Sequence, residues 1–112
     1  MLACDAADVA VVPFPFTDLA VAKPRPALAL SGRKANEDAG STVFAMITSA
    51  ARSRWPTDIP LADVDAAGLA TPSVVRLKLF TLDNRLVSRT IGALSARDRE
   101  AVRRMLKHLL TI

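Results

Sequence analysis

Short runs of apolar and β-branched residues, separated by glycine, proline and polar residues, recur along the chain. Runs of this length and spacing are typical of strands in a small β protein. The run at 8–14 is apolar on both faces, so we expect a central strand there. Further strands are predicted at 26–30, 42–49, 73–81 and 86–91, with a short one at 57–59.

Prolines and polar residues mark the expected connections. Pro13 and Pro15 are predicted to end the pairing of the first strand, because proline has no N–H for the ladder, and a loop is expected at 17–24. Glycine and asparagine predict a polar turn at 31–41, and irregular segments are expected at 50–60 and 66–72.

The strand predicted at 73–81 has the cleanest alternation, and a period of two places every second residue on one face of a sheet. One face is expected to be apolar and the other mixed. The first face holds Val75, Leu77 and Leu79, and the second holds Arg76, Lys78 and Phe80.

A helix is predicted to begin after Ser95. Asp98 follows three residues later, which is a capping pattern: the serine accepts a free N–H, and the acid lies at the positive end of the helix dipole. Several strands closed by one helix predict a mainly β fold, a small barrel with a C-terminal helix. The helix carries an apolar stripe of Val102, Met105, Leu106, Leu109 and Leu110, with Arg99, Arg103, Arg104 and Lys107 largely off it.

Composition fits a single domain over residues 1–112, with 51% hydrophobic residues to build one core. No apolar run approaches the roughly 18 residues of a membrane span, and no signal peptide is apparent. Cys4 is the single cysteine and cannot form an internal disulfide, which favours a cytoplasmic location. It lies in an N-terminus expected to be frayed, which argues against a nucleophile.

The net charge is +4, and residues 23–54 and 85–112 hold nearly all of the 15 Lys and Arg residues. A basic surface attracts phosphates through Coulomb attraction and counterion release. The same charge also fits an ordinary soluble surface, so it favours nucleic-acid binding only slightly.

Most enzyme signatures are missing. The only histidine, His108, lies late in the helix, so a histidine metal site or a Ser/His/Asp triad is not expected. There is no glycine-rich phosphate loop. Asp63 and Asp65 have the spacing of turn formers more than that of metal ligands.

The remaining candidate is a site of arginine and hydroxyl groups. Arg25 lies between Pro24 and Pro26, which stiffen the backbone and suit the display of a forked, permanent charge toward a phosphate. Thr48 and Ser49 end a predicted strand. Each candidate also has a structural interpretation: Arg25 could pair with Asp18, Thr48 could be an ordinary strand residue, and Arg76 could be a covered arginine paired with a carboxylate.

These segments together resemble the PemK/MazF-like toxins of bacterial toxin–antitoxin systems. The resemblance extends from about Asp8 to Leu110. It rests on 11–18 (VVPFPFTD), 25–28 (RPAL), 47–49 (ITS), 72–76 (PSVVR) and 91–95 (IGALS).

The resemblance implies an SH3-like, partly open barrel of about five to seven strands that forms a homodimer. It also implies a metal-independent endoribonuclease without a cofactor, which cuts single-stranded RNA at short sequences. The implied partner is an antitoxin with a disordered acidic tail, and promoter DNA would be bound only through that antitoxin. The 2′-OH would attack the adjacent phosphate, so DNA should not be cut.

Carried over by position, Arg25 matches the family's catalytic arginine and Thr48 its hydroxyl residue. Arg76 matches a basic residue that contacts the substrate in some members. We also expect substrate contacts from Ser49, Lys78, Trp55 and Thr17.

Two positions depart from the family pattern. Ala7 stands where many relatives have glycine before the first strand. Lys78 stands where some have an acid two residues after the strand arginine, which removes a candidate general base.

Two other classes of function stay open: a non-catalytic binder of nucleic acid or gyrase, and a DNA-binding autoregulator. Trp55 could stack on a base or plug a rim. The apolar helix stripe and the central strands favour a self-complementary dimer surface.

Overall fold

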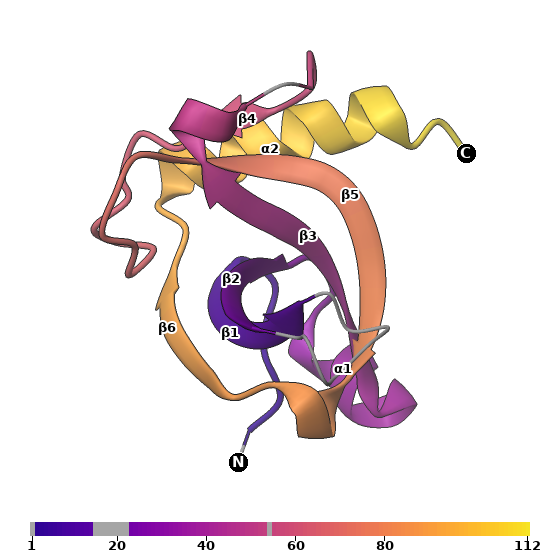
Figure 1. Cartoon of the computed structure of the whole chain (residues 1–112). Coiled ribbons are helices and arrows are strands. Elements are labelled where there is room, and N and C mark those ends of the chain that lie inside the picture. Colours follow the sequence, from indigo (N-terminus) through magenta and orange to yellow (C-terminus); the bar gives the residue numbers. More distant parts are fainter. Residues whose placement is uncertain (1, 15–22, 54) are drawn as a thin grey trace.

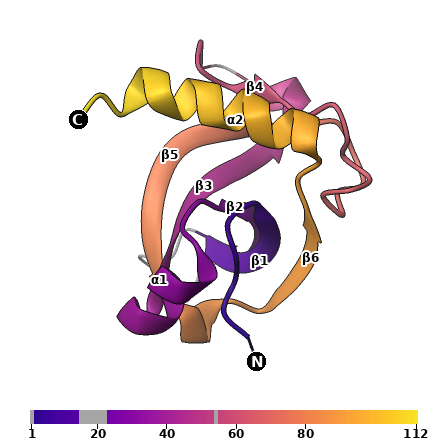
Figure 2. The ribbon, with the colours of Figure 1, turned by 180° about the vertical axis from the view of Figure 1, so that it is seen from behind.

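The computed structural model describes residues 2–14, 23–53 and 55–112 and shows a curled antiparallel sheet beside a long helix (Figure 1). The strand order is β4-β5-β3-β2-β1-β6. Helix α2 (Ala96–Leu109) crosses one side of the curled sheet, as the view from behind also shows (Figure 2). This confirms the prediction of a mainly β, partly open barrel with a C-terminal helix. The strands are β1 (Asp8–Phe14), β2 (Lys23–Ala29), β3 (Ser41–Ser49), β4 (Ile59–Pro60), β5 (Ser73–Asp83) and β6 (Arg89–Ala93).

Apolar side chains pack on both faces of the sheet. Neighbours within a strand, such as Ala27 and Leu28, belong to different clusters, because successive side chains point to opposite faces. The larger cluster includes Leu28 and Val75 and is covered by α2 through Val102. The second cluster centres on Phe44. Within the described residues, no helix is long and apolar enough to cross a membrane.

The start of β2 differs from the prediction. Lys23 and Pro24 belong to the strand and not to a loop, and Pro13 does not end β1, because Pro13 and Pro24 lie opposite each other in the register. Proline has no N–H, and at this pair neither strand depends on an N–H from the other. Beside β3, in contrast, β2 pairs only through 27–29, so the segment with Pro24 and Pro26 is free of β3.

The predicted polar turn at 31–41 contains a helix, α1 (Arg33–Ala39), which ends at Gly40 in the left-handed conformation (φ 73°). The helix has no apolar stripe and is fixed instead by buried Asn36. The Asn36 amide donates to the Cys4 carbonyl at 2.8 Å and to the Ser31 carbonyl at 3.0 Å. Cys4 is therefore buried and held in place, contrary to the expected frayed N-terminus.

The last strand begins later than predicted. Asp83 accepts a bond from the Arg85 N–H at 2.8 Å and starts a 3₁₀ turn at Asn84–Leu86. That turn takes up the first residue of the predicted 86–91 segment, and pairing with β1 begins only at Arg89. The short strand predicted at 57–59 is found at Ile59–Pro60.

Strand β5 carries a bulge next to Arg76. Met46 lies opposite Arg76, but Ala45 lies opposite Leu79, so Leu77 and Lys78 are extra residues in β5. The predicted alternation persists through it: Val75, Leu77 and Leu79 pack in the larger cluster, whereas Phe80 packs against the second.

The predicted start of the helix is confirmed, and the acid in its first turn, Asp98, also binds a neighbouring loop. Ser95 caps α2 by accepting from the Asp98 N–H at 3.3 Å. Asp98 is 2% exposed, and its carboxylate accepts from the N–H groups of Ala62 and Asp63, both at 2.8 Å. The first turn of α2 therefore holds the loop that precedes β5.

That loop also lies directly against β6. A Cβ atom at Gly92 would come within 2.4 Å of the Ala67 backbone, so only glycine allows this approach. The Ala93 N–H donates to the Ala66 carbonyl at 3.1 Å. The start of the 62–70 loop is thus held by α2, and its middle by β6.

Candidate functional site

A cleft of about 280 Å³ lies where β2 and β3 part. The absence of an N–H on Pro24 and Pro26 explains the parting, since neither can donate a ladder bond to β3. The cleft brings together three residues that the sequence predicted: Arg25, Thr48 and Ser49. It is lined by Arg25, Pro26, Ile47, Thr48, Ser49, Arg52, Leu69, Ala70, Thr71 and Ser73.

The strand register places Arg25 and Thr48. Pairing of β2 with β3 ends at Ala27 opposite Met46, and two residues beyond that pair in each strand are Arg25 and Thr48, which line the cleft together. On its other side Arg25 pairs with Val12 of β1. The arginine is therefore fixed by the buried central strand while its side chain is exposed.

The charge of Arg25 is not compensated within the described part of the chain. Its guanidinium forms no hydrogen bond or ion pair there, and none of the described residues that line the cleft is acidic. Arg52 adds a second cation to the lining. Asp18, the structural partner considered for Arg25, lies outside the described residues, as does Thr17. A cleft with two cations and no acid attracts an anion.

Hydroxyl groups also line the cleft. Ser49 accepts from the Ala51 N–H at 3.2 Å, and Ser73 donates to the Thr71 carbonyl at 2.8 Å, so both are engaged with the backbone. The half-buried Thr48 hydroxyl has no hydrogen-bond partner among the described residues. It is available to donate to an oxygen atom in the cleft.

Arg76 has a different environment. Its Nε and Nη2 atoms donate to the two Asp58 carboxylate oxygens at 3.1 and 3.0 Å, and Nη2 also donates to the Arg52 carbonyl at 3.3 Å. Its guanidinium carbon lies 5.1 Å from the Trp55 ring centroid. The structural interpretation of Arg76, a covered arginine paired with a carboxylate, describes this geometry. Its contact with substrate stays a prediction.

Asp58 is the buried member of this pair, with 3% of its side chain exposed against 14% for Arg76. Burial by itself raises the pKa of the carboxyl. The hydrogen bonds that it accepts, above all from Arg76 and Ser53, outweigh burial and hold the pKa below its ordinary value of 3.8.

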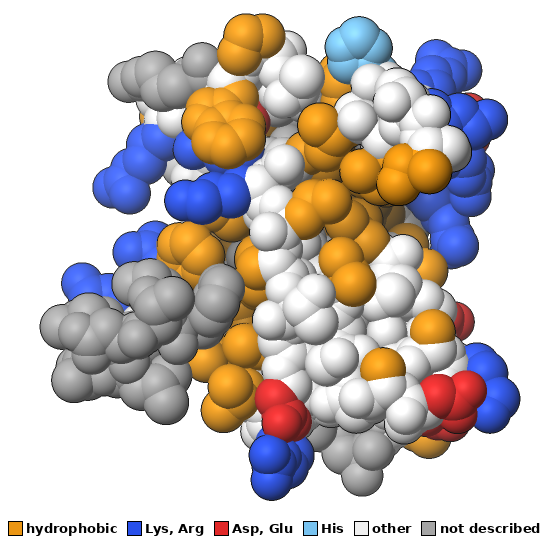
Figure 3. Space-filling view, turned by 90° about the vertical axis from the view of Figure 1, so that its right-hand side faces the viewer, with side chains coloured by type: hydrophobic (Ala, Val, Ile, Leu, Met, Phe, Trp, Pro, Cys, Tyr) orange, Lys and Arg blue, Asp and Glu red, His pale blue; other side chains and the backbone are white. Residues whose placement is uncertain are grey.

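Two further predicted contact residues lie outside the cleft lining. Lys78 is exposed on the β5 bulge. Trp55 is 41% exposed on the segment between β3 and β4. The space-filling view shows Lys and Arg side chains beside hydrophobic ones at its upper left, and a second basic group near the single histidine of α2 (Figure 3).

Sequence reasoning missed Arg52 and Asp58. Arg52 follows the strand end at Ser49 by three residues and belongs to the basic stretch Arg52-Ser53-Arg54. This proximity to Ser49 is a local signal that Arg52 could lie at the same site. Asp58 and Arg76 are separated by β4 and a long loop, so no local spacing connects them.

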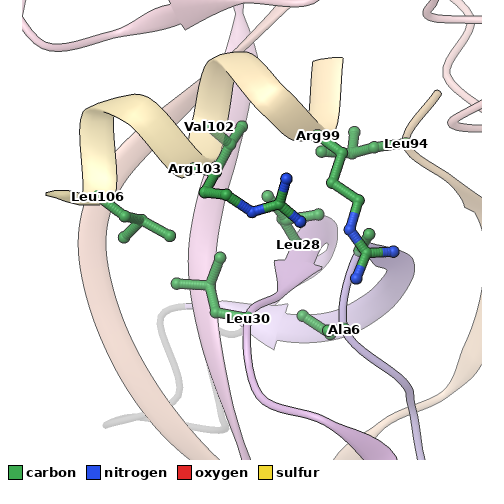
Figure 4. A pocket seen from close by; sticks show the side chains of 10 residues that line it. Ala6, Leu28, Leu30, Leu94, Arg99, Val102, Arg103 and Leu106 are labelled. Atoms are coloured by element: carbon green, nitrogen blue, oxygen red, sulfur yellow. The ribbon is translucent and has the colours of Figure 1, made fainter. Parts of the chain in front are cut away.

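A second, apolar hollow of about 130 Å³ lies between α2 and β2. Figure 4 shows Arg99 and Arg103 extending from the helix beside a floor that includes Leu28 and Leu30. Among the described residues, none that was predicted to bind or cleave a substrate lines it, so the β2–β3 cleft is the candidate site.

The family model for the PemK-like, MazF-like toxin of type II toxin–antitoxin systems matches residues 5–110. No curated protein matches the chain by sequence. Among solved structures, MazF from Deinococcus radiodurans is 25% identical, with a TM-score of 0.76 over 98% of each chain.

Two mycobacterial structures have the same fold. One is an endoribonuclease from a mycobacterial species in complex with its cognate antitoxin, 17% identical, with a TM-score of 0.76 over 100% of this chain and 97% of its own. The other is the Mycobacterium tuberculosis toxin MazF-mt6, 24% identical, with a TM-score of 0.72 over 90% and 93%.

Proposed function

We propose that this chain, which belongs to the family of PemK-like, MazF-like toxins of type II toxin–antitoxin systems, is an endoribonuclease that cleaves single-stranded RNA in the β2–β3 cleft. One observation carries the proposal: the Arg25 guanidinium and the Thr48 hydroxyl line the same cleft, and within the described residues neither has a partner and no acid lines that cleft. This arrangement suits a phosphate whose negative charge grows during reaction.

The proposed reaction uses the nucleophile that RNA itself carries. The O2′ atom bonds to the adjacent phosphorus while its proton passes to solvent hydroxide, and the P–O5′ bond breaks as O5′ takes a proton from water. The products are a 2′,3′-cyclic phosphate and a 5′-OH end. Arg25 donates to the non-bridging oxygens as they gain charge, and Thr48 donates to one of them.

Further contacts would hold the RNA along the cleft. Arg52 and Ser49 line it beside Thr48 and lie within reach of neighbouring phosphates or riboses. Lys78 and Trp55 lie outside it, where they would contact flanking nucleotides, as would Thr17. The basic charge of the chain supports an affinity for RNA that falls as salt rises.

We also propose an antitoxin and a second copy of the chain as partners. The mycobacterial endoribonuclease was solved with its cognate antitoxin, which supports an antitoxin for this chain. For the second copy, Leu109 and Leu110 at the end of the α2 stripe are 44% and 54% exposed. A dimeric mass in dilute light scattering is expected, and a monomeric mass contradicts the dimer.

The test is cleavage of single-stranded RNA by the purified chain in EDTA, compared with Arg25→Ala. We expect the wild type to leave cyclic phosphate ends and Arg25→Ala to lose cleavage. The matched control is Arg85→Ala, because Arg85 is exposed and pairs with Asp83 outside the cleft lining. Intact RNA at high wild-type concentration contradicts the proposal, and salt-sensitive binding without cleavage indicates a non-catalytic member.

A further inference from the structure

The Asp58 carboxylate connects β5 to the segment that leads away from the cleft. Besides Arg76, it accepts from the Ser53 hydroxyl at 2.8 Å and from the Trp55 N–H at 3.3 Å. The Asp58 N–H donates back to the Trp55 carbonyl at 3.0 Å. A single buried acid therefore fixes the backbone on both sides of Trp55.

The same segment begins in the cleft. Arg52 lines the cleft with its side chain, while its carbonyl accepts from Arg76. Trp55 follows three residues later, so its Cα lies within about 10 Å of the Arg52 Cα. A single strand bound in the cleft can therefore continue past Trp55.

The Trp55 ring is open to solvent although it packs on Arg76. The guanidinium lies over the ring at 5.1 Å, yet 41% of the residue is exposed. An aromatic ring held in place, with accessible area beside a basic cleft, is what unpaired bases stack on. The Asp58 partner neutralises Arg76, so the ring and not the largely covered cation is the group offered to a ligand.

We infer that Asp58 is a positioning residue that, through Arg76, holds Trp55 as a stacking platform for an unpaired base next to the cleft. The inference rests on the proposed function, and it assigns to Arg76 a structural role at the substrate site in place of direct phosphate binding. Stacking on Trp55 stabilises the bound substrate and the transition state to the same extent. Its loss therefore raises KM and leaves kcat nearly unchanged.

The kinetic test compares Trp55→Phe, Trp55→Ala and Asp58→Asn in RNA cleavage. We expect about a tenfold rise in KM for Trp55→Ala and less for Trp55→Phe, which keeps an aromatic face. Asp58→Asn should also raise KM, and adding it to Trp55→Ala should cause no further rise, because both changes remove one platform. Melting curves confirm that each variant is folded, and Arg85→Ala is the control.

The spectroscopic test uses Trp55 as the only tryptophan of the chain. The probe is the RNA substrate with a single 2′-deoxy nucleotide at the cleavage position, which binds without being cut. We expect it to quench the fluorescence in proportion to occupancy, and to quench folded Asp58→Asn less at equal occupancy. A purely structural role for Asp58 predicts equal quenching.

Two outcomes separate the inference from the proposed function. If the wild type cleaves RNA through Arg25 but the Trp55 variants keep its KM, or bound probe leaves the fluorescence unchanged, the inference is wrong and the proposed function stands. If the wild type neither binds nor cleaves RNA, both are overturned.

Discussion

Arg25 and Arg76 are both arginines on neighbouring parts of one sheet, yet their surroundings are opposite. Arg25 is exposed, and no described acid compensates it. Arg76 is largely covered and bound to both oxygens of Asp58. An uncompensated cation can respond to a substrate's charge, whereas a neutralised one mainly maintains a shape. Contact with a partner, more than residue type, thus separates a candidate catalytic group from a positioning one.

The largest expected effect is on cleavage by Arg25→Ala. Removing a preorganised donor from the transition state should lower kcat by about 100-fold to 1,000-fold. Stability should hardly change, because the Arg25 side chain makes no hydrogen bond or ion pair within the described residues. Arg25→Lys should recover only part of the rate, since lysine lacks the fork. A rate assay and a melting curve on each variant measure both quantities. A large loss of stability in Arg25→Ala would contradict the contrast between a reactive Arg25 and a structural Arg76.

Arg76→Ala should show the reverse pattern. It removes both bonds from Arg76 to the buried Asp58 carboxylate, so we expect the melting temperature to fall by about 5 °C or more. The double variant Arg76→Ala/Asp58→Ala should be less destabilised, because the buried carboxylate is then removed together with the cation. Thermal denaturation of the set provides the measurement. If Arg76→Ala melts like the wild type but loses kcat, Arg76 acts on the substrate as Arg25 does.

Thr48→Val should have a smaller effect on cleavage than Arg25→Ala. The variant keeps the shape of the strand residue but loses one hydrogen bond to a charged oxygen, so we expect about a tenfold to 100-fold loss in kcat. Thr48→Ser keeps the hydroxyl and should stay near the wild-type rate. Equal rates for the valine and serine variants would assign Thr48 to an ordinary strand position.

The smallest effect is a difference in acid sensitivity. Asp58 has a lowered pKa in the folded chain, so its contribution to stability is present above 3.8 and is lost as the pH falls through the folded value. Other carboxyls with lowered values, such as Asp83 with a pKa of about 2, affect wild type and variant alike. Melting temperatures between pH 2 and 6 should therefore fall less steeply for Asp58→Asn, while Arg25→Ala should parallel the wild type.

The sequence predicted the parts of the site whose signals are local. Pro24 and Pro26 stiffen the backbone around Arg25, and Thr48 ends a strand whose bounds were predicted within one residue. The same prolines also free β2 from β3, a consequence that appears only once the two strands are neighbours.

Other features depend on contacts between distant segments, which no period reveals. Helix α1 is fixed by the buried Asn36 and not by an apolar stripe, so its sequence looks like a turn. Asp58 binds Arg76, from which β4 and a long loop separate it along the chain. The bulge of β5 beside that arginine likewise depends on the partner strand. Within the site, the sequence thus identified the cation but not whether an acid neutralises it.

The most direct test is to measure cleavage and melting of Arg25→Ala side by side, in EDTA, on an RNA with one scissile site and on the same RNA with a 2′-deoxy nucleotide there. The account predicts that the wild type cuts only the first RNA and leaves a cyclic phosphate, and that Arg25→Ala loses at least about 100-fold in rate at an unchanged melting temperature. A wild-type rate for Arg25→Ala, or cleavage of the deoxy-substituted RNA at that position, would contradict it.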